Sequence, residues 1–237
     1  MSVGLIAALP AEVRCFIHAS PKLNIPFALT PHLTGIVCGI GRDAADAAAK
    51  TLLGLNIEAL VSWGTAGALS PELRAGDLLL PDNFLAGDGR YLVTDKTWLE
   101  RIRRALQPAS LTIHNGHMTE ARDILTGAAS KRELHLRTEA LAADMETAAI
   151  MENASAGKVP CIVIRTVVDE AHMSIPGALV RHMDRYGRPG PAGVILEIFR
   201  SPPIIGDLYR LGTAMRKAMT TLQMLTVRTN STLMYKS

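Results

Sequence analysis

Three carboxylates follow predicted strands at points where a ligand could reach them. Each acid comes after an apolar run: Glu12 after Val3–Ala8, Glu146 after Leu141–Asp144, and Asp169 after Pro160–Val168. Ligands of open α/β sheets bind outside the carboxyl ends of the strands. If these ends converge, the three acids share one pocket, where one can bind hydroxyl groups and another can give up a proton.

A glycine-containing segment follows a fourth predicted strand. Ala59–Trp63 is apolar and opens into Gly64–Ala68, which we expect to be a loop. Glycines let backbone N–H groups approach an anion or a sugar closely, and Thr65 adds a hydroxyl. This set of groups suits cleavage of a glycosidic bond to a heterocyclic base, because the leaving base must be protonated while positive charge builds on the sugar. Burial behind Val167 and Val168 would help Asp169 to keep its proton near neutral pH.

The elements that position these residues alternate between strand-like and helical patterns. This alternation predicts an α/β fold, a single domain whose mixed central sheet is flanked by helices in three α/β/α layers. The 237 residues, 48% hydrophobic and 20% charged, suffice for one full core. Residues 20–32 are expected to form a loop. A further strand is expected at Leu78–Leu80. Helices are expected at Ala11–Ala19, Asp43–Leu53, Thr97–Leu106, Ser130–Leu141 and Thr147–Ala156.

Prolines break the C-terminal third of the sequence. They predict a long loop after Asp169, a short helix near Val194–Phe199 and a final helix over Leu208–Leu225. The domain is therefore expected to span residues 1–237. Its C-terminal helices within residues 191–226 would pack on the sheet, and residues 227–237 would form a flexible tail.

Composition argues against several classes of partner and cofactor. The net charge of +3 is spread along the chain and aromatics make up only 4%, so we expect no nucleic-acid binding. Cys15, Cys38 and Cys161 have no metal-ligand spacing and are predicted to be thiols in a reducing compartment. We expect no metal and no organic cofactor. The N-terminus lacks signal-peptide features and no apolar run reaches the ~18 residues of a membrane helix, which predicts a cytoplasmic protein.

Each candidate residue also has a purely structural interpretation. Glu12 and Glu146 could offset a helix dipole, Asp169 and Thr65 could cap turns, and Met145 could fill the core. The functional interpretation is favoured because the residues occur together at successive strand ends.

The motifs resemble a known family. Ser62–Gly67, Ala143–Glu146 and Arg165–Asp169 are similar, in this order, to the nucleoside phosphorylase and methylthioadenosine/S-adenosylhomocysteine nucleosidase superfamily. Farther along, Asp169–Ala171, Ile175–Leu179 and Ser201–Pro203 resemble the branch of hopanoid-associated phosphorylases. That branch is implicated in removing adenine from adenosylhopane.

The resemblance implies a role for each candidate residue. Asp169 would protonate or bind N7 of the purine, Glu146 would hold the ribose hydroxyls and Met145 would pack against the sugar. Thr65, Ala66 and Gly67 would face the nucleophile side of the ribose, and Glu12 would activate water. Nucleosidases carry an aromatic residue in the segment equivalent to Arg122–Ile124. Here Asp123 replaces it beside Ile124, which favours a bulkier or unusual nucleoside.

The attacking group remains open at this point. Glu12 argues for water, whereas Arg14 could clamp inorganic phosphate as a co-substrate, and Arg42 is another candidate anion contact. The alternatives for function are a methylthioadenosine/S-adenosylhomocysteine nucleosidase, a general purine nucleoside phosphorylase and a non-catalytic nucleoside-binding protein. The resemblance also implies a homo-oligomer, a dimer or larger. An amphiphilic substrate further predicts peripheral membrane contact through Met173–Leu211.

Overall fold

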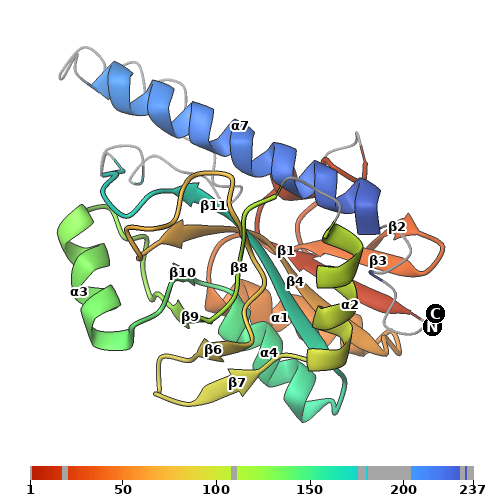
Figure 1. The fold of residues 1–237 in the computed structure, drawn as a ribbon. Helices are drawn as coiled ribbons and strands as arrows, with labels where there is room; N and C mark the ends of the chain where they lie inside the picture. Colours follow the sequence, from red (N-terminus) through yellow and green to blue (C-terminus); the bar gives the residue numbers. More distant parts are fainter. Residues whose placement is uncertain are drawn as a thin grey trace.

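A mixed sheet runs through the molecule, with helices on both of its faces (Figure 1). The computed structural model describes residues 2–17, 21–107, 111–175, 180, 204–229 and 233. The centre of the sheet consists of parallel strands in the order β3 (Leu33–Val37), β1 (Val3–Ala7), β4 (Ala59–Ala68) and β11 (Cys161–Asp169). The predicted α/β domain with a mixed sheet between helical layers is confirmed.

Shorter strands extend the sheet on both sides of this centre. β2 (Phe27–Thr30) is antiparallel to β3, and β5 (Leu78–Leu79) joins β11 to β8 (Ile113–His114). Beyond the end of β1, β10 (Ala142–Asp144) pairs antiparallel with the last part of β4 and leads outward through the remaining strands. These are β9 (His117–Glu120), β6 (Asn83–Leu85) and β7 (Tyr91–Val93).

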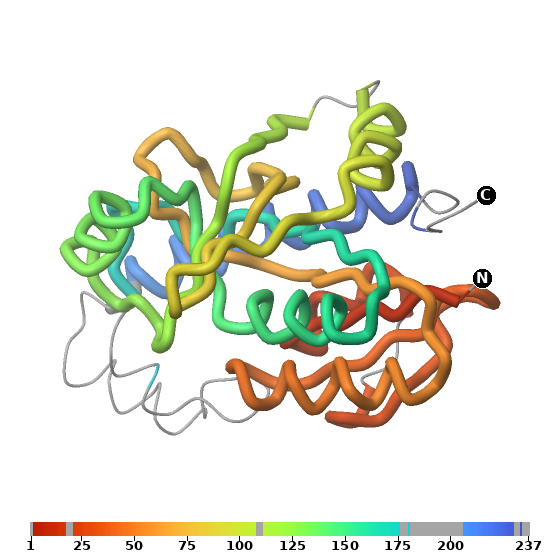
Figure 2. The backbone as a smooth tube through the Cα atoms, turned by 90° about the horizontal axis from the view of Figure 1, so that it is seen from below, coloured from red at the N-terminus to blue at the C-terminus, as the bar shows by residue number. Residues whose placement is uncertain are grey.

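Alternating side chains of the central strands build two separate cores, one on each face of the sheet. Ile6 and Leu60 point to the core that contains helices α1 (Arg42–Leu53) and α4 (Thr147–Ala156). Leu5 and Val61 point to the core that contains α2 (Lys96–Leu106) and α7 (Ile204–Thr229). This period of two is what an extended strand imposes. α1 and α4 lie side by side across one face (Figure 2), and their buried residues are mostly alanines, which allow close approach. α3 (Ala128–Thr138) lies beside β9 and β10 (Figure 1).

The long strand β4 changes partners along its length. On one side it pairs with β1 as far as Trp63 and then with β10 from Gly67 onward. On its other side, β11 stays paired with it through Asp169, opposite Gly67. The segment Gly64–Ala68, expected to be a loop, is therefore strand, because pairing with β11 holds the glycines extended. The ends of β1, β10 and β11 gather around this branch point.

Other local predictions were wrong in part. Instead of a helix over Ala11–Ala19, the short 3-10 helix η1 covers Pro10–Val13. The carbonyl oxygen of Glu12, which a continuing α-helix would use, accepts a hydrogen bond from Trp63 Nε1 at 2.8 Å. Residues 20–32, expected to be a loop, contain β2. The final helix begins before Leu208 and ends after Leu225.

Several predictions concern residues that the structure does not describe. The helix at Val194–Phe199 and most of Met173–Leu211 and of residues 227–237 lie outside the described residues. Among the helices that the structure describes, none is both long and apolar enough to cross a bilayer.

Candidate active site

A pocket of about 410 Å³ opens at the branch point of β4. Eight of the nine residues predicted for the site line it: Glu12, Thr65, Ala66, Gly67, Ile124, Met145, Glu146 and Asp169. Their catalytic and binding roles stay predictions. Arg14, the predicted phosphate contact, has an exposed side chain and does not line the pocket. The structure thus brings the acids together and leaves Arg14 out.

Glu12 is fixed against the strand that carries the glycines. Its Oε1 accepts hydrogen bonds from the backbone N–H and the hydroxyl of Thr65, both at 2.8 Å, and its Oε2 accepts from Leu9 N at 2.9 Å. Burial raises the pKa of Glu12, while the charge of Arg165 and these hydrogen bonds oppose the shift. Gly64 is required here, since it has φ +150° and a Cβ would lie 2.6 Å from Glu12 Oε1. Glu12 is therefore a fixed carboxylate with raised basicity.

Glu146 lies just after β10 at the start of α4. Its Oε1 accepts a hydrogen bond from Gly41 N at 2.7 Å, which ties β10 to the turn before α1. Burial, followed by the charge of Asp144, raises the pKa of Glu146 to about 7. A carboxyl with this pKa can both donate to and accept from sugar hydroxyls near neutral pH.

A buried network beneath Glu146 holds β10, β4 and β11 together. Asp144 Oδ1 accepts from the backbone of Glu146 and Thr147, capping α4, and its Oδ2 accepts from Arg165 Nε at 2.8 Å. Arg165 also donates to the hydroxyls of Ser62 and Thr147. Asp144, which lines the pocket, thus links the three strands together with Ser62 and Arg165, which do not line it, and this is a positioning role.

Asp169 ends β11 and is paired with a lysine that the sequence analysis missed. Lys131, in the first turn of α3, is only 1% exposed and donates to Asp169 Oδ2. Burial raises the pKa of Asp169, while the Lys131 ammonium acts to lower it. Nothing in the local sequence marks Lys131, because it lies between Ser130 and Arg132 in a segment that reads as a solvated helix face.

The rest of the pocket wall is apolar. Residues of α7 and of the loops after β1 and β3 contribute Leu208, Leu211, Met215, Leu9 and Ile40. Asp123 and Ile124 also line the pocket, at the position where nucleosidases were expected to carry an aromatic residue. Among the described residues that line it, none is aromatic. Contact with a purine ring would therefore come from aliphatic side chains.

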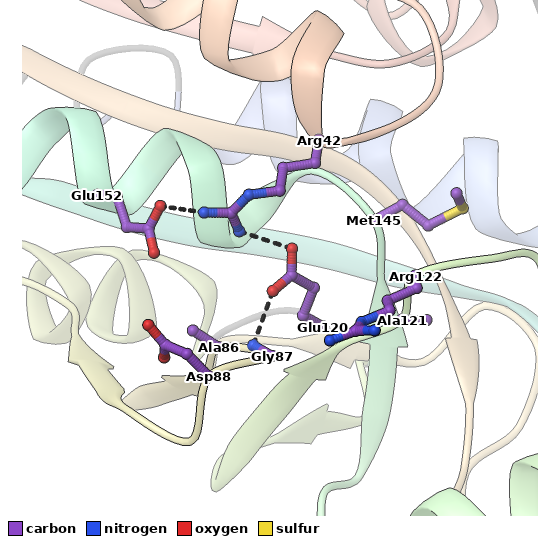
Figure 3. A pocket seen from close by; sticks show the side chains of 9 residues that line it. All are labelled: Arg42, Ala86, Gly87, Asp88, Glu120, Ala121, Arg122, Met145 and Glu152. Atoms are coloured by element: carbon purple, nitrogen blue, oxygen red, sulfur yellow. Dashed lines mark hydrogen bonds and ion pairs between the residues drawn. The ribbon is translucent and has the colours of Figure 1, made fainter.

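A second pocket, of about 390 Å³, shares Ala121 and Met145 with the first (Figure 3). Four charged residues of its lining and the neighbouring Arg90 form what we call the rim cluster: Arg42, Asp88, Glu120, Glu152 and Arg90. Arg42 is bound to both Glu120 and Glu152, as the dashed lines in Figure 3 mark. Arg90 binds Asp88 and Glu152. Arg42, a candidate anion contact, is therefore already neutralised by two carboxylates.

No group of three or more His, Cys, Asp or Glu placed to hold a metal ion occurs within the described ranges. The acids of the pocket instead bind backbone N–H groups, hydroxyls, Lys131 or Arg165.

The three-layer fold and its acid-lined pocket at the strand ends define the class of nucleoside phosphorylases and nucleosidases. The sequence matches the Phosphorylase superfamily over residues 3–183, and the chain belongs to this family. A curated relative, the 5'-methylthioadenosine/S-adenosylhomocysteine nucleosidase of Staphylococcus aureus (strain JH9), is 26% identical over 212 residues. That match covers 75% of this chain and 92% of the relative. The chain is thus an enzyme of this class.

Solved structures show the same fold. The futalosine hydrolase of Helicobacter pylori strain 26695 superimposes with a TM-score of 0.72 at 14% identity, covering 98% of this chain and 97% of that one. The 5'-methylthioadenosine/S-adenosylhomocysteine nucleosidase of Neisseria meningitidis, in complex with methylthio-immucillin-A, superimposes with a TM-score of 0.70 at 17% identity. This superposition covers 96% of this chain and 99% of the nucleosidase chain.

Proposed function

We propose that this enzyme hydrolyses the N-glycosidic bond of an adenine nucleoside with an apolar 5′ substituent, adenosylhopane being the substrate. The observation that carries the proposal is the single pocket in which Glu12, Glu146 and Asp169 meet under an apolar wall. The family and the nucleosidase relatives support glycosidic cleavage. The apolar wall and the resemblance to hopanoid-associated phosphorylases support the particular substrate.

The three acids divide the reaction between them. Glu12 takes a proton from water as the water oxygen bonds to C1′ of the ribose. The C1′–N9 bond breaks, its electron pair goes to the purine, and Asp169 supplies the proton that the purine takes up at N7. Glu146 holds the ribose hydroxyls against the charge that builds on the sugar. The products are adenine and the free sugar, and solvent exchange returns both acids to their starting states.

The charges around the pocket support water rather than phosphate as the attacking group. Of the described residues that line it, Lys131 is the one cation, and its ammonium is bound to Asp169. Arg14 and Arg42 are not available, as described above. Phosphate would have to enter beside several carboxylates without a free cation, which is electrostatically unfavourable.

The apolar wall supports a large 5′ substituent. Leu208, Leu211 and Met215 of α7 line the same pocket as the sugar-binding candidates. The volume, near the lower part of the ~300–1,000 Å³ typical of small-molecule sites, suits a nucleoside. A polycyclic hydrocarbon would then extend past α7 toward solvent or a bilayer. Tyr209, 70% exposed on the same turn of α7, would meet it there.

A second candidate function follows from the curated relative, whose name specifies 5'-methylthioadenosine and S-adenosylhomocysteine. These nucleosides carry smaller 5′ groups, and the same three acids would serve them. The two candidates differ in the 5′ group and not in the chemistry.

Adenine release measured on three substrates tests both candidates. We expect kcat/KM to be highest for adenosylhopane presented in detergent micelles, lower for 5'-methylthioadenosine and S-adenosylhomocysteine, and unchanged by added phosphate. Glu12→Gln keeps the size of the side chain and should lower release by about 10²-fold. Strict dependence on phosphate would overturn hydrolysis, and preference for methylthioadenosine would favour the second candidate. Flotation with liposomes, with and without adenosylhopane, tests the proposed membrane contact.

A further inference from the structure

The ammonium group of Lys131 has no hydrogen left for a substrate. An ammonium carries three N–H donors and no acceptor. Lys131 Nζ donates to Asp169 Oδ2, to the carbonyl oxygen of Glu170 at 2.9 Å and to that of Met173 at 3.0 Å. Any effect of Lys131 on a bound nucleoside must therefore pass through Asp169 or through the turn after it.

The two oxygens of Asp169 have different surroundings. Oδ2 is bound to Lys131, whereas Oδ1 lies beside Gly67, where a Cβ would be only 3.1 Å away. Gly67 lines the pocket together with Asp169. Lys131 thus holds Oδ2, whereas Oδ1 lies next to Gly67, a part of the pocket wall that has no side chain.

We propose that Lys131 is a positioning residue that sets the pH range over which Asp169 holds its proton and stabilises the carboxylate left when that proton goes to the base. The inference rests on the proposed glycosidic cleavage. When Asp169 gives its proton to N7, a negative charge develops on a buried carboxyl, beside an ammonium that is already in place. A fixed charge that is complementary to charge developing in the transition state lowers the barrier, and it needs no rearrangement at that moment.

Other charged groups near the pocket do not provide this effect. Glu12 of η1, Asp144 and Glu146 of the β10 segment and Asp123 of the segment before α3 also line it, and all are acids. Lys131 contacts Asp169 directly, and its positive charge opposes the burial that raises the pKa of Asp169. Arg165 is bound to Asp144 instead.

Carbon-13 NMR of the side-chain carboxyls tests the coupling without requiring any activity. The Asp169 resonance is identified by its absence in Asp169→Asn. In Lys131→Met, we expect it to titrate about 1–3 pH units higher than in the wild type, because a nearby cation lowers a carboxyl pKa by that amount. Lys131→Gln, which keeps donors for the carbonyls of Glu170 and Met173, is the second variant should the methionine protein fold poorly. Titration at an unchanged pH would overturn the proposal.

Kinetics give a readout that a merely structural role would not move. Lys131→Met should lower kcat by about 10–10²-fold, because one preorganised electrostatic contact is lost. It should also shift the alkaline limb of the pH profile of kcat/KM to higher pH. Lys131→Arg should return this limb to its wild-type position. Lys50→Met, which removes an exposed lysine of α1 paired with Asp46, is the matched control and should change neither. A lower rate with an unmoved limb would contradict the proposal. If the wild type releases no adenine but the expected NMR shift is observed, the proposed function is rejected, whereas the effect of Lys131 on Asp169 is supported.

Discussion

Two neighbouring pockets both contain carboxylates paired with cations, but they differ in how deeply these charged residues are buried. In the active-site pocket, Glu12, Asp144, Glu146 and Asp169 are all buried. Two buried cations are paired with them: Lys131, which also lines the pocket, with Asp169, and Arg165, which does not line it, with Asp144. In the rim cluster, the three acids are bound to two arginines, and both arginines are substantially exposed. The pockets touch at Ala121 and Met145, so the difference arises over a short distance.

This difference in burial changes what the carboxyls can do. Burial raises the pKa of Glu12, Glu146 and Asp169, whereas hydrogen bonds from Arg90 lower the pKa of the exposed Asp88. A raised pKa lets a carboxyl hold its proton to a higher pH than usual, whereas a lowered pKa keeps the carboxyl ionised. We therefore assign the proposed proton transfer to the buried pocket, whereas the rim cluster is a set of ion pairs around two exposed arginines.

The strongest test of this contrast changes one aspartate in each pocket. Asp169→Asn keeps the size of the side chain but removes its acid function, and adenine release should fall by about 10²–10⁴-fold in kcat/KM. Asp88→Asn in the rim cluster should leave the rate unchanged. Thermal unfolding of both variants checks that each is folded. Near wild-type release by Asp169→Asn on every adenine nucleoside would remove Asp169 from the mechanism.

A backbone change should disturb the same pocket less directly. In Gly64→Ala the new methyl group meets the carboxylate of Glu12, which must move. Displacement of a reacting group by about 1 Å can cost about 10²-fold, so kcat/KM should fall by up to that factor. Gly89→Ala is the matched control, because Gly89 also has a positive φ (+88°) but nothing lies within 4 Å of a Cβ there. Equal losses in both variants would mean that backbone strain, not Glu12, is responsible.

Local signals in the sequence mark Glu12, Glu146 and Asp169, which the structure brings to one pocket. Glu146 and Asp169 follow strands at the points where the pattern changes, and the predicted helix Thr147–Ala156 matches α4 at both ends. The strand-end rule then brings such residues together without knowledge of the tertiary contacts.

Features that depend on distant partners could not be predicted in this way. Gly64 and Gly67 suggest a loop, but pairing with β11, about a hundred residues farther along, makes the segment a strand. Lys131 is buried because Asp169, 38 residues away in sequence, provides its counter-charge. Arg14 illustrates the opposite error. It is near Glu12 in sequence, but the turn of η1 directs its side chain away from the pocket lining.

The raised pKa of Glu146 should make the free energy of unfolding depend on pH. Its pKa is raised from 4.5 to about 7, so the folded state binds this proton more tightly than the unfolded state. The resulting stability is present below pH 4.5 and is lost as the pH rises toward 7, by up to about 3 kcal/mol. Glu146→Gln carries no charge at any pH, so its free energy of unfolding should increase relative to wild type across this window. Urea unfolding at pH 5 and pH 8 measures the change, with the exposed Glu72→Gln as control. A difference independent of pH would contradict the raised pKa.

The smallest effect should come from the rim cluster. Arg42→Met removes a guanidinium that is 45% exposed and binds Glu120 and Glu152. Glu120 is mostly buried but keeps the hydrogen bond from Gly87 N, and Glu152 keeps its ion pair with Arg90, so the loss of stability should be about 1 kcal/mol. Arg90 shares Glu152 with Arg42, and a double-mutant cycle with Arg90→Met should therefore show a small coupling in urea unfolding. Adenine release should not change, because Arg42→Met leaves in place the Gly41 N–H that binds Glu146. A tenfold loss of release in a fully folded Arg42→Met protein would mean that the two pockets act as one site, with Arg42 as an anion contact after all.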